Sequence, residues 1–84
     1  MDEHDETMAL HVVGWIVGDQ RRAERMLDVT GLSADGLRTA VGDPVQLGAI
    51  LDFLLDYEPD LLRCAEALDL RPERIVAARE RLRS

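Results

Sequence analysis

The sequence feature that most constrains the fold is the stretch 43–57, which reads Asp-Pro-Val-Gln-Leu-Gly-Ala-Ile-Leu-Asp-Phe-Leu-Leu-Asp-Tyr. Asp43 is suited to cap a helix, and Pro44 suits the first turn, because the N–H that proline lacks would have no partner there. At about 100° per residue, the apolar side chains of this stretch cover roughly two-thirds of the helix circumference. Such a helix stays soluble only when other helices surround it. The sequence therefore predicts a central apolar helix over about residues 44–57.

The rest of the chain supplies shorter amphipathic segments that are separated by glycine, serine and proline. Asp19 and Ser33 are typical N-caps, and Gly31 is a typical helix stop. No segment alternates apolar and polar residues as a half-buried strand would. The expected flanking helices are 6–17, 20–30, 34–41, 59–68 and 72 onward. We therefore predict an all-α fold, a compact bundle of five or six short helices around the central helix.

The length of 84 residues fits one domain. We expect residues 1–5, Met-Asp-Glu-His-Asp, to be a disordered acidic tail and residues 6–84 to form a single helical domain. The formal net charge of −7 opposes binding to phosphates and to acidic membranes. The longest near-apolar run, 8–17, is shorter than the ~20 residues that a membrane span needs. The single cysteine, Cys64, fits a reducing compartment, so the expected location is the cytoplasm.

The chain offers few groups for metal binding or catalysis. Residues with metal-ligand chemistry gather near the N-terminus, at Asp2, His4, Asp5 and Glu6. They lack the helical spacing of an H-E-x-x-H site, so a solvated tail is the favoured interpretation. His11 is expected at the rim of an apolar face, and Cys64 as a small core residue, because no histidine stands near it in sequence. The sequence thus predicts no catalytic, cofactor-binding or metal-binding residues, no cofactor and no small-molecule substrate.

The central helix carries one polar strip, formed by Gly48, Asp52 and Asp56 at four-residue spacing. Two carboxylates one turn apart can act as acid and base or hold a cation, which would require a concave pocket around them. The favoured alternative is that the strip faces water or binds an arginine. We expect Arg38 to be that arginine.

Residues 61–83 share some features with a helix-turn-helix. Ala65, Asp69 and Ile75 stand where such motifs have a small residue, a turn residue and a buried aliphatic residue. Arg71 would be the one good base reader. The expected phosphate contacts would be Arg74, Arg79, Arg81 and Arg83. Because the whole domain is acidic, simple packing of the two helices is favoured, and nucleic acid is not an expected partner.

Several stretches between Glu6 and Leu82 form a recognisable set: 9–10, 14–16, 19, 25–31, 37–38, 43–44, 51–56, 65–70, 72–73 and 77–79. With them the chain resembles a family of small uncharacterised alphaproteobacterial proteins, domain of unknown function 3572. The segment Leu-Asp-Phe-Leu-Leu at 51–55 is the most distinctive. The chain departs from the family pattern at Gln20, where a proline is expected, and at Pro59, which interrupts a run of leucines. The resemblance implies a small helical bacterial protein and carries no activity, cofactor or site.

The leading functional prediction is a non-enzymatic protein-interaction module in the bacterial cytoplasm. It follows from two features of the sequence. No set of residues with catalytic spacing is present, and the chain has more apolar surface than five short helices are expected to bury. Exposed surface on the central helix would bind a protein partner or form a homodimer seam. Two alternatives stay open, a helix-turn-helix-like nucleic-acid-binding protein using residues 61–83 and a small enzyme using Asp52 and Asp56.

Overall fold

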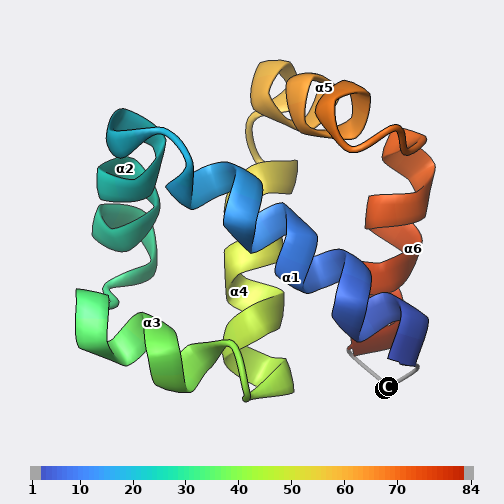
Figure 1. Ribbon diagram of the computed structural model, residues 1–84. Coiled ribbons are helices and arrows are strands. Elements are labelled where there is room, and N and C mark those ends of the chain that lie inside the picture. The colour runs from blue at the N-terminus through green and yellow to red at the C-terminus, as the bar shows by residue number, and fades with distance from the viewer. Residues whose placement is uncertain (1–2, 83–84) are drawn as a thin grey trace.

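The computed structural model describes residues 3–82, and these residues form six α-helices (Figure 1). The helices are α1 Glu3–Val17, α2 Gln20–Thr30, α3 Ala34–Ala40, α4 Pro44–Leu55, α5 Glu58–Ala67 and α6 Pro72–Leu82. Short turns connect them. The predicted all-α bundle is confirmed.

The central position of α4 is also confirmed, since α4 contacts each of the other five helices. Figure 1 shows α1 crossing α4, with α2 and α3 on one side and α5 and α6 on the other. The Asp43 side chain caps α4 by accepting a hydrogen bond from the Val45 N–H at 2.9 Å. The helix ends at Leu55, two residues earlier than expected, and Tyr57 becomes the N-cap residue of α5. With the break there, Pro59 falls in the first turn of α5, where its missing N–H leaves no hydrogen bond unmade.

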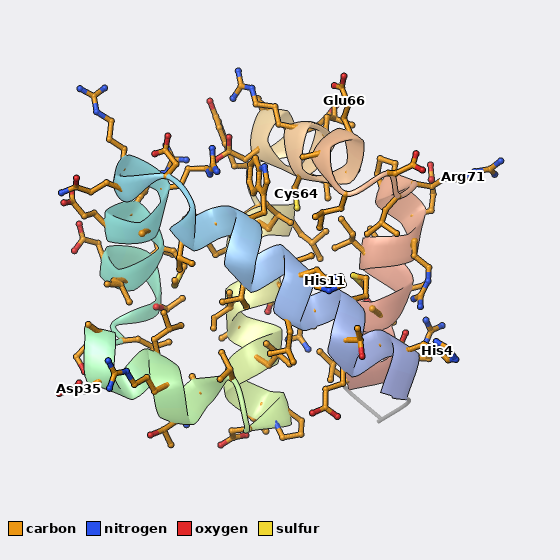
Figure 2. All side chains as sticks on the ribbon, viewed as in Figure 1. His4, His11, Asp35, Cys64, Glu66 and Arg71 are labelled. Atoms are coloured by element: carbon orange, nitrogen blue, oxygen red, sulfur yellow. The ribbon has the colours of Figure 1, made fainter. Side chains whose placement is uncertain are left out.

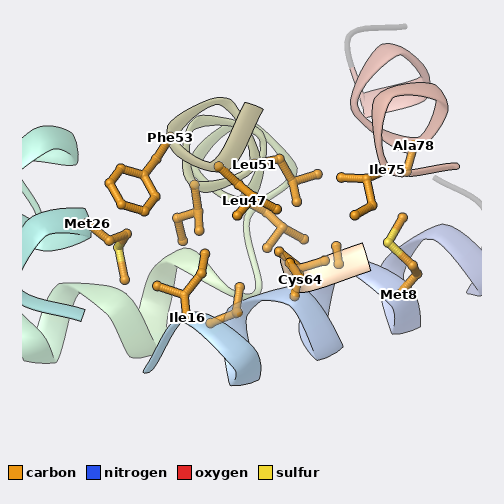
Figure 3. Close-up of a cluster of buried hydrophobic side chains, with 14 of the residues drawn as sticks. Met8, Ile16, Met26, Leu47, Leu51, Phe53, Cys64, Ile75 and Ala78 are labelled. Carbon is orange, nitrogen blue, oxygen red and sulfur yellow. The ribbon is translucent and has the colours of Figure 1, made fainter. Parts of the chain in front are cut away.

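The core is a continuous cluster to which all six helices contribute (Figure 3). Within it, α4 and α1 each supply five buried apolar side chains, and those of α4 are Leu47, Ile50, Leu51, Phe53 and Leu54. Met26 of α2 and Ile16 of α1 pack at one end of the cluster, and Ile75 of α6 packs at the other. In the described part of the chain, no helix is both long enough and apolar enough to span a membrane.

The expectation of a disordered tail over residues 1–5 is wrong for residues 3–5, because α1 begins at Glu3. Asp5 is only 1% exposed. Its carboxylate accepts hydrogen bonds from Arg74 at 2.8 Å and from both Nε and Nη2 of Arg81. A carboxylate is costly to bury unless it is paired, and two arginines of α6 supply the pairing. Residues 1–2 of the expected tail lie outside the described residues.

Candidate functional site

The polar strip of α4 binds an arginine, but not the expected one. Arg79 of α6 donates from Nε to Asp52 Oδ1 at 2.7 Å and from Nη2 to Asp52 Oδ2 at 2.8 Å. These hydrogen bonds raise the pKa of the Arg79 guanidinium above its usual value. Arg38 is an exposed residue of α3, so its assignment as the partner of Asp52 is wrong. The two-bond geometry fixes α6 against α4.

Gly48 is buried rather than solvent-facing, which corrects a second part of the predicted strip. A Cβ at Gly48 would lie 2.6 Å from Arg79 Nη1, so the glycine makes room for the guanidinium. The exposed residues of α4 are instead Pro44, Val45 and Ala49, followed by Asp56 just beyond its end. The six buried residues of α4, Gly48 among them, face the other helices instead of solvent.

Asp52→Ala is expected to lower the free energy of unfolding by about 1 kcal/mol, a modest value because the Asp52 side chain is 39% exposed. The matched control Asp56→Ala removes an exposed carboxylate and should change that free energy by no more than about 0.5 kcal/mol. Urea denaturation followed by circular dichroism measures both values. Equal effects of the two substitutions would contradict the assigned pair.

A hollow of about 320 Å³ opens where the middle of α2 meets the C-terminal end of α4. We call it the aromatic groove, and its lining residues are Arg25, Val29, Phe53, Asp56 and Tyr57. Phe53 is 7% exposed, whereas Val29 is 65% and Tyr57 48% exposed. The groove thus combines a buried aromatic residue with two exposed apolar side chains.

The cation of the aromatic groove is held in place by α5. The Arg25 Nη2 donates to Asp60 Oδ2 at 2.5 Å, and Asp60 is 4% exposed. Arg63 also donates to Asp60, at 3.2 Å. The Arg25 Cζ lies 5.3 Å from the Tyr57 ring centroid and 5.9 Å from that of Phe53, within range of a cation–π interaction. Arg25 is therefore ordered above the two rings.

A second hollow, of about 400 Å³, lies between α1 and the α5–α6 turn. We call it the histidine pocket, and its lining residues are His4, Thr7, Met8, His11, Leu68, Leu70 and Arg74. Both histidines of the chain line it, and His11 is exposed as expected for a rim residue (Figure 2). Among residues 3–82, no three histidine, cysteine or acidic side chains are grouped to hold a metal ion.

The positions of the α6 arginines test whether residues 61–83 could bind nucleic acid as a helix-turn-helix. Arg74 and Arg81 bind Asp5, and Arg79 binds Asp52, so three of the expected phosphate contacts form ion pairs within the chain. Arg83 lies outside the described residues, and Arg71 is exposed. The turn itself matches the expectation for Asp69, which has a positive φ of 55°. Arg74, Arg79 and Arg81 of α6 are thus directed to acidic groups of α1 and α4.

Cys64 is fully buried, in line with its predicted place in the core. Burial is the main cause that raises the pKa of its thiol to about 11. The thiol therefore stays protonated at neutral pH, and a protonated thiol is a poor nucleophile.

The small-enzyme alternative required a pocket around both carboxylates of α4. Asp56 lines the aromatic groove, whereas Asp52 lines neither of the two hollows and is bound to Arg79. The two carboxylates are therefore not brought together in either hollow.

The main feature that the sequence analysis missed is the aromatic groove. Its signal in the sequence is Val29, an apolar residue on the outer side of α2 next to the charged Asp28. A single exposed apolar side chain is common on protein surfaces, so Val29 alone does not indicate a binding site. It indicates one only when the structure places it beside Phe53 and Tyr57.

The similarity of the chain to a known protein family extends over nearly its whole length. Searches of curated proteins and of solved structures give no match. Residues 2–84 match a family model described as "Protein of unknown function (DUF3572)". This range includes every helix of the bundle and both hollows. The chain therefore belongs to the DUF3572 family.

Proposed function

We propose that this protein is a non-enzymatic interaction module of the bacterial cytoplasm, and that its aromatic groove binds a basic amphipathic helix of a partner protein. The observation that carries the proposal is the exposure of Val29 and Tyr57 beside the buried Phe53. In helix-in-groove recognition, apolar side chains of the partner fill such a hollow. Aromatic residues at the centre of the contact commonly supply much of the binding energy.

The charge around the aromatic groove favours a basic partner. Asp56 lines the groove. Two further carboxylates are exposed next to its apolar residues in sequence, since Asp28 precedes Val29 and Glu58 follows Tyr57. The one lining cation, Arg25, is paired with Asp60. Lysine or arginine beside the apolar anchors of a partner helix would complement these carboxylates and speed association.

The same charge argues against a second copy of the chain as the occupant. Each copy carries a formal net charge of −7, so two copies repel each other at low ionic strength. The groove residues are also held in position before binding, because the buried Asp60 orients Arg25 over both rings. A preformed groove loses less conformational entropy when a partner binds.

The test uses the ring resonances of Phe53 and Tyr57, which are the only phenylalanine and tyrosine of the chain. The probe is a synthetic amphipathic helical peptide with leucine on one face and arginine on the flanks. Its counterpart carries glutamate in place of arginine. Both rings are expected to shift saturably with the arginine peptide and to remain unshifted with the glutamate peptide.

Two variants make this test specific. Val29→Asp should weaken binding of the arginine peptide at least about tenfold, because it places a carboxylate among the apolar anchors. Val45→Asp is the matched control, since Val45 is 79% exposed and does not line the groove. Unshifted rings, equal binding of the two peptides, or equal losses in the two variants would each overturn the proposal. In light scattering, a dimer that Val29→Asp dissociates would identify a second copy as the occupant instead.

A further inference from the structure

We propose that the histidine pocket binds a small amphipathic anion, namely a carboxylate joined to an unbranched apolar chain. The proposal is independent of the aromatic groove, because no residue lines both hollows. The volume of about 400 Å³ falls within the range of small-molecule sites in proteins.

The polar lining of the histidine pocket favours an anion. Its polar side chains are His4, Thr7, His11 and Arg74, and no carboxylate lines it. This is unusual surface for a chain with a formal net charge of −7. The aromatic groove, by contrast, includes Asp56. An anion approaching the histidine pocket therefore meets donors and a guanidinium instead of like charge.

Arg74 retains hydrogen-bonding capacity for such a ligand. Its Nη1 donates to Asp5 Oδ1 at 2.8 Å, and among the described residues no acceptor binds its Nε or Nη2. Asp5 also binds Arg81 through both of its oxygens, so one carboxylate is shared by two guanidinium groups. A guanidinium binds a carboxylate well because its planar N–H groups match the two oxygens.

The apolar lining indicates that the anion carries a hydrocarbon part. Met8 is 6% exposed, and Leu68 and Leu70 are half-buried against the core. These side chains come from both walls of the pocket, α1 on one side and the α5–α6 turn on the other. A hydrocarbon chain between them would remove their remaining surface from water, which an inorganic anion cannot do.

The test is a titration with sodium octanoate, followed by the ring resonances of His4 and His11, the only two histidines of the chain. Acetate tests the charge without the hydrocarbon, octanol tests the hydrocarbon without the charge, and inorganic phosphate tests a bare anion. Octanoate is expected to shift both rings saturably and to bind at least about tenfold more tightly than each of the other three.

Variants separate the pocket from general effects on the fold. Thr7→Asp places a carboxylate at the rim and leaves the Asp5–Arg74 pair intact, so it should weaken octanoate binding about tenfold. Its control is Thr39→Asp, at an exposed threonine of α3 outside the pocket. Arg74→Gln should also weaken binding, with the exposed Arg71→Gln as control. The proposal would be overturned if octanoate shifted neither ring, or if Thr7→Asp left octanoate binding unchanged. Equally tight binding of octanol, acetate or phosphate would also overturn it.

Discussion

Leu51→Ala is expected to lower the free energy of unfolding by about 2–5 kcal/mol, the usual cost of a leucine-sized cavity in a core. Leu51 is fully buried in α4, the helix that contacts all the others. A domain of this length has a total stability of roughly 4–13 kcal/mol, so the loss would be a large part of the whole. Urea denaturation measures it as a lower midpoint with an unchanged m-value.

The control for this experiment lies on the same helix. Val45→Ala also truncates an aliphatic side chain, but Val45 is 79% exposed. Its effect should stay within about 0.5 kcal/mol. Similar losses for Leu51→Ala and Val45→Ala would contradict the placement of α4 at the centre of the bundle.

Asp5→Ala is expected to lower the free energy of unfolding by about 2 kcal/mol, because it removes the buried acceptor that joins α1 to α6. The value is moderate because Arg74 and Arg81 are 35% and 48% exposed and can turn to water. Glu6→Ala is the matched control, since Glu6 is the next residue and is exposed. Thermal or urea unfolding of the two variants gives the comparison.

The Asp5 interaction also predicts a pH dependence. The hydrogen bonds from Arg81, together with the weaker effect of the one from Arg74, hold the pKa of Asp5 well below its usual value. A carboxyl whose pKa is lowered on folding stabilises the protein above its unfolded-state pKa of about 3.9. That contribution is lost progressively as the pH falls below this value toward the folded-state pKa. Between neutral pH and acid, wild type should therefore lose more stability than Asp5→Ala, and an equal loss would contradict the assigned pair.

The sequence was sufficient where structure depends on neighbouring residues. Asp19, Ser33 and Asp43 each accept a hydrogen bond from the first turn of the helix they precede, and Gly31 has a left-handed conformation with φ 77°. Helix caps of this kind involve residues within about one turn of each other, so a single stretch of sequence contains both partners. For this reason the first residues of α2, α3 and α4 and the last residue of α2 could be predicted.

The ion pairs could not be predicted, because they join distant parts of the chain. Asp52 and Arg79 are 27 positions apart, and Asp5 and Arg81 are 76 apart. Arg38 was a reasonable partner for Asp52 only because it is nearer in sequence. The actual pairing depends on how α6 packs on α4 and α1, and that packing is a property of the whole bundle. The same dependence explains why Asp5 resembled part of a solvated tail.

Both hollows depend on packing in the same way. The aromatic groove requires Val29 of α2 to lie beside Phe53 of α4, and the histidine pocket requires α1 to lie beside the α5–α6 turn. The sequence predicted an interaction surface on the central helix but placed it along the helix. In the structure, exposed Tyr57, which follows α4, lines the aromatic groove together with exposed Val29 of α2.

The proposed role depends most directly on where a basic amphipathic helix contacts the protein. Intermolecular nuclear Overhauser effects between leucine methyl protons of the arginine-flanked peptide and the aromatic protons of the protein measure this contact. The aromatic groove predicts effects to the rings of Phe53 and Tyr57, and none to the ring of Trp15, which does not line it. Binding of the peptide without effects to Phe53 or Tyr57 would contradict the proposed function.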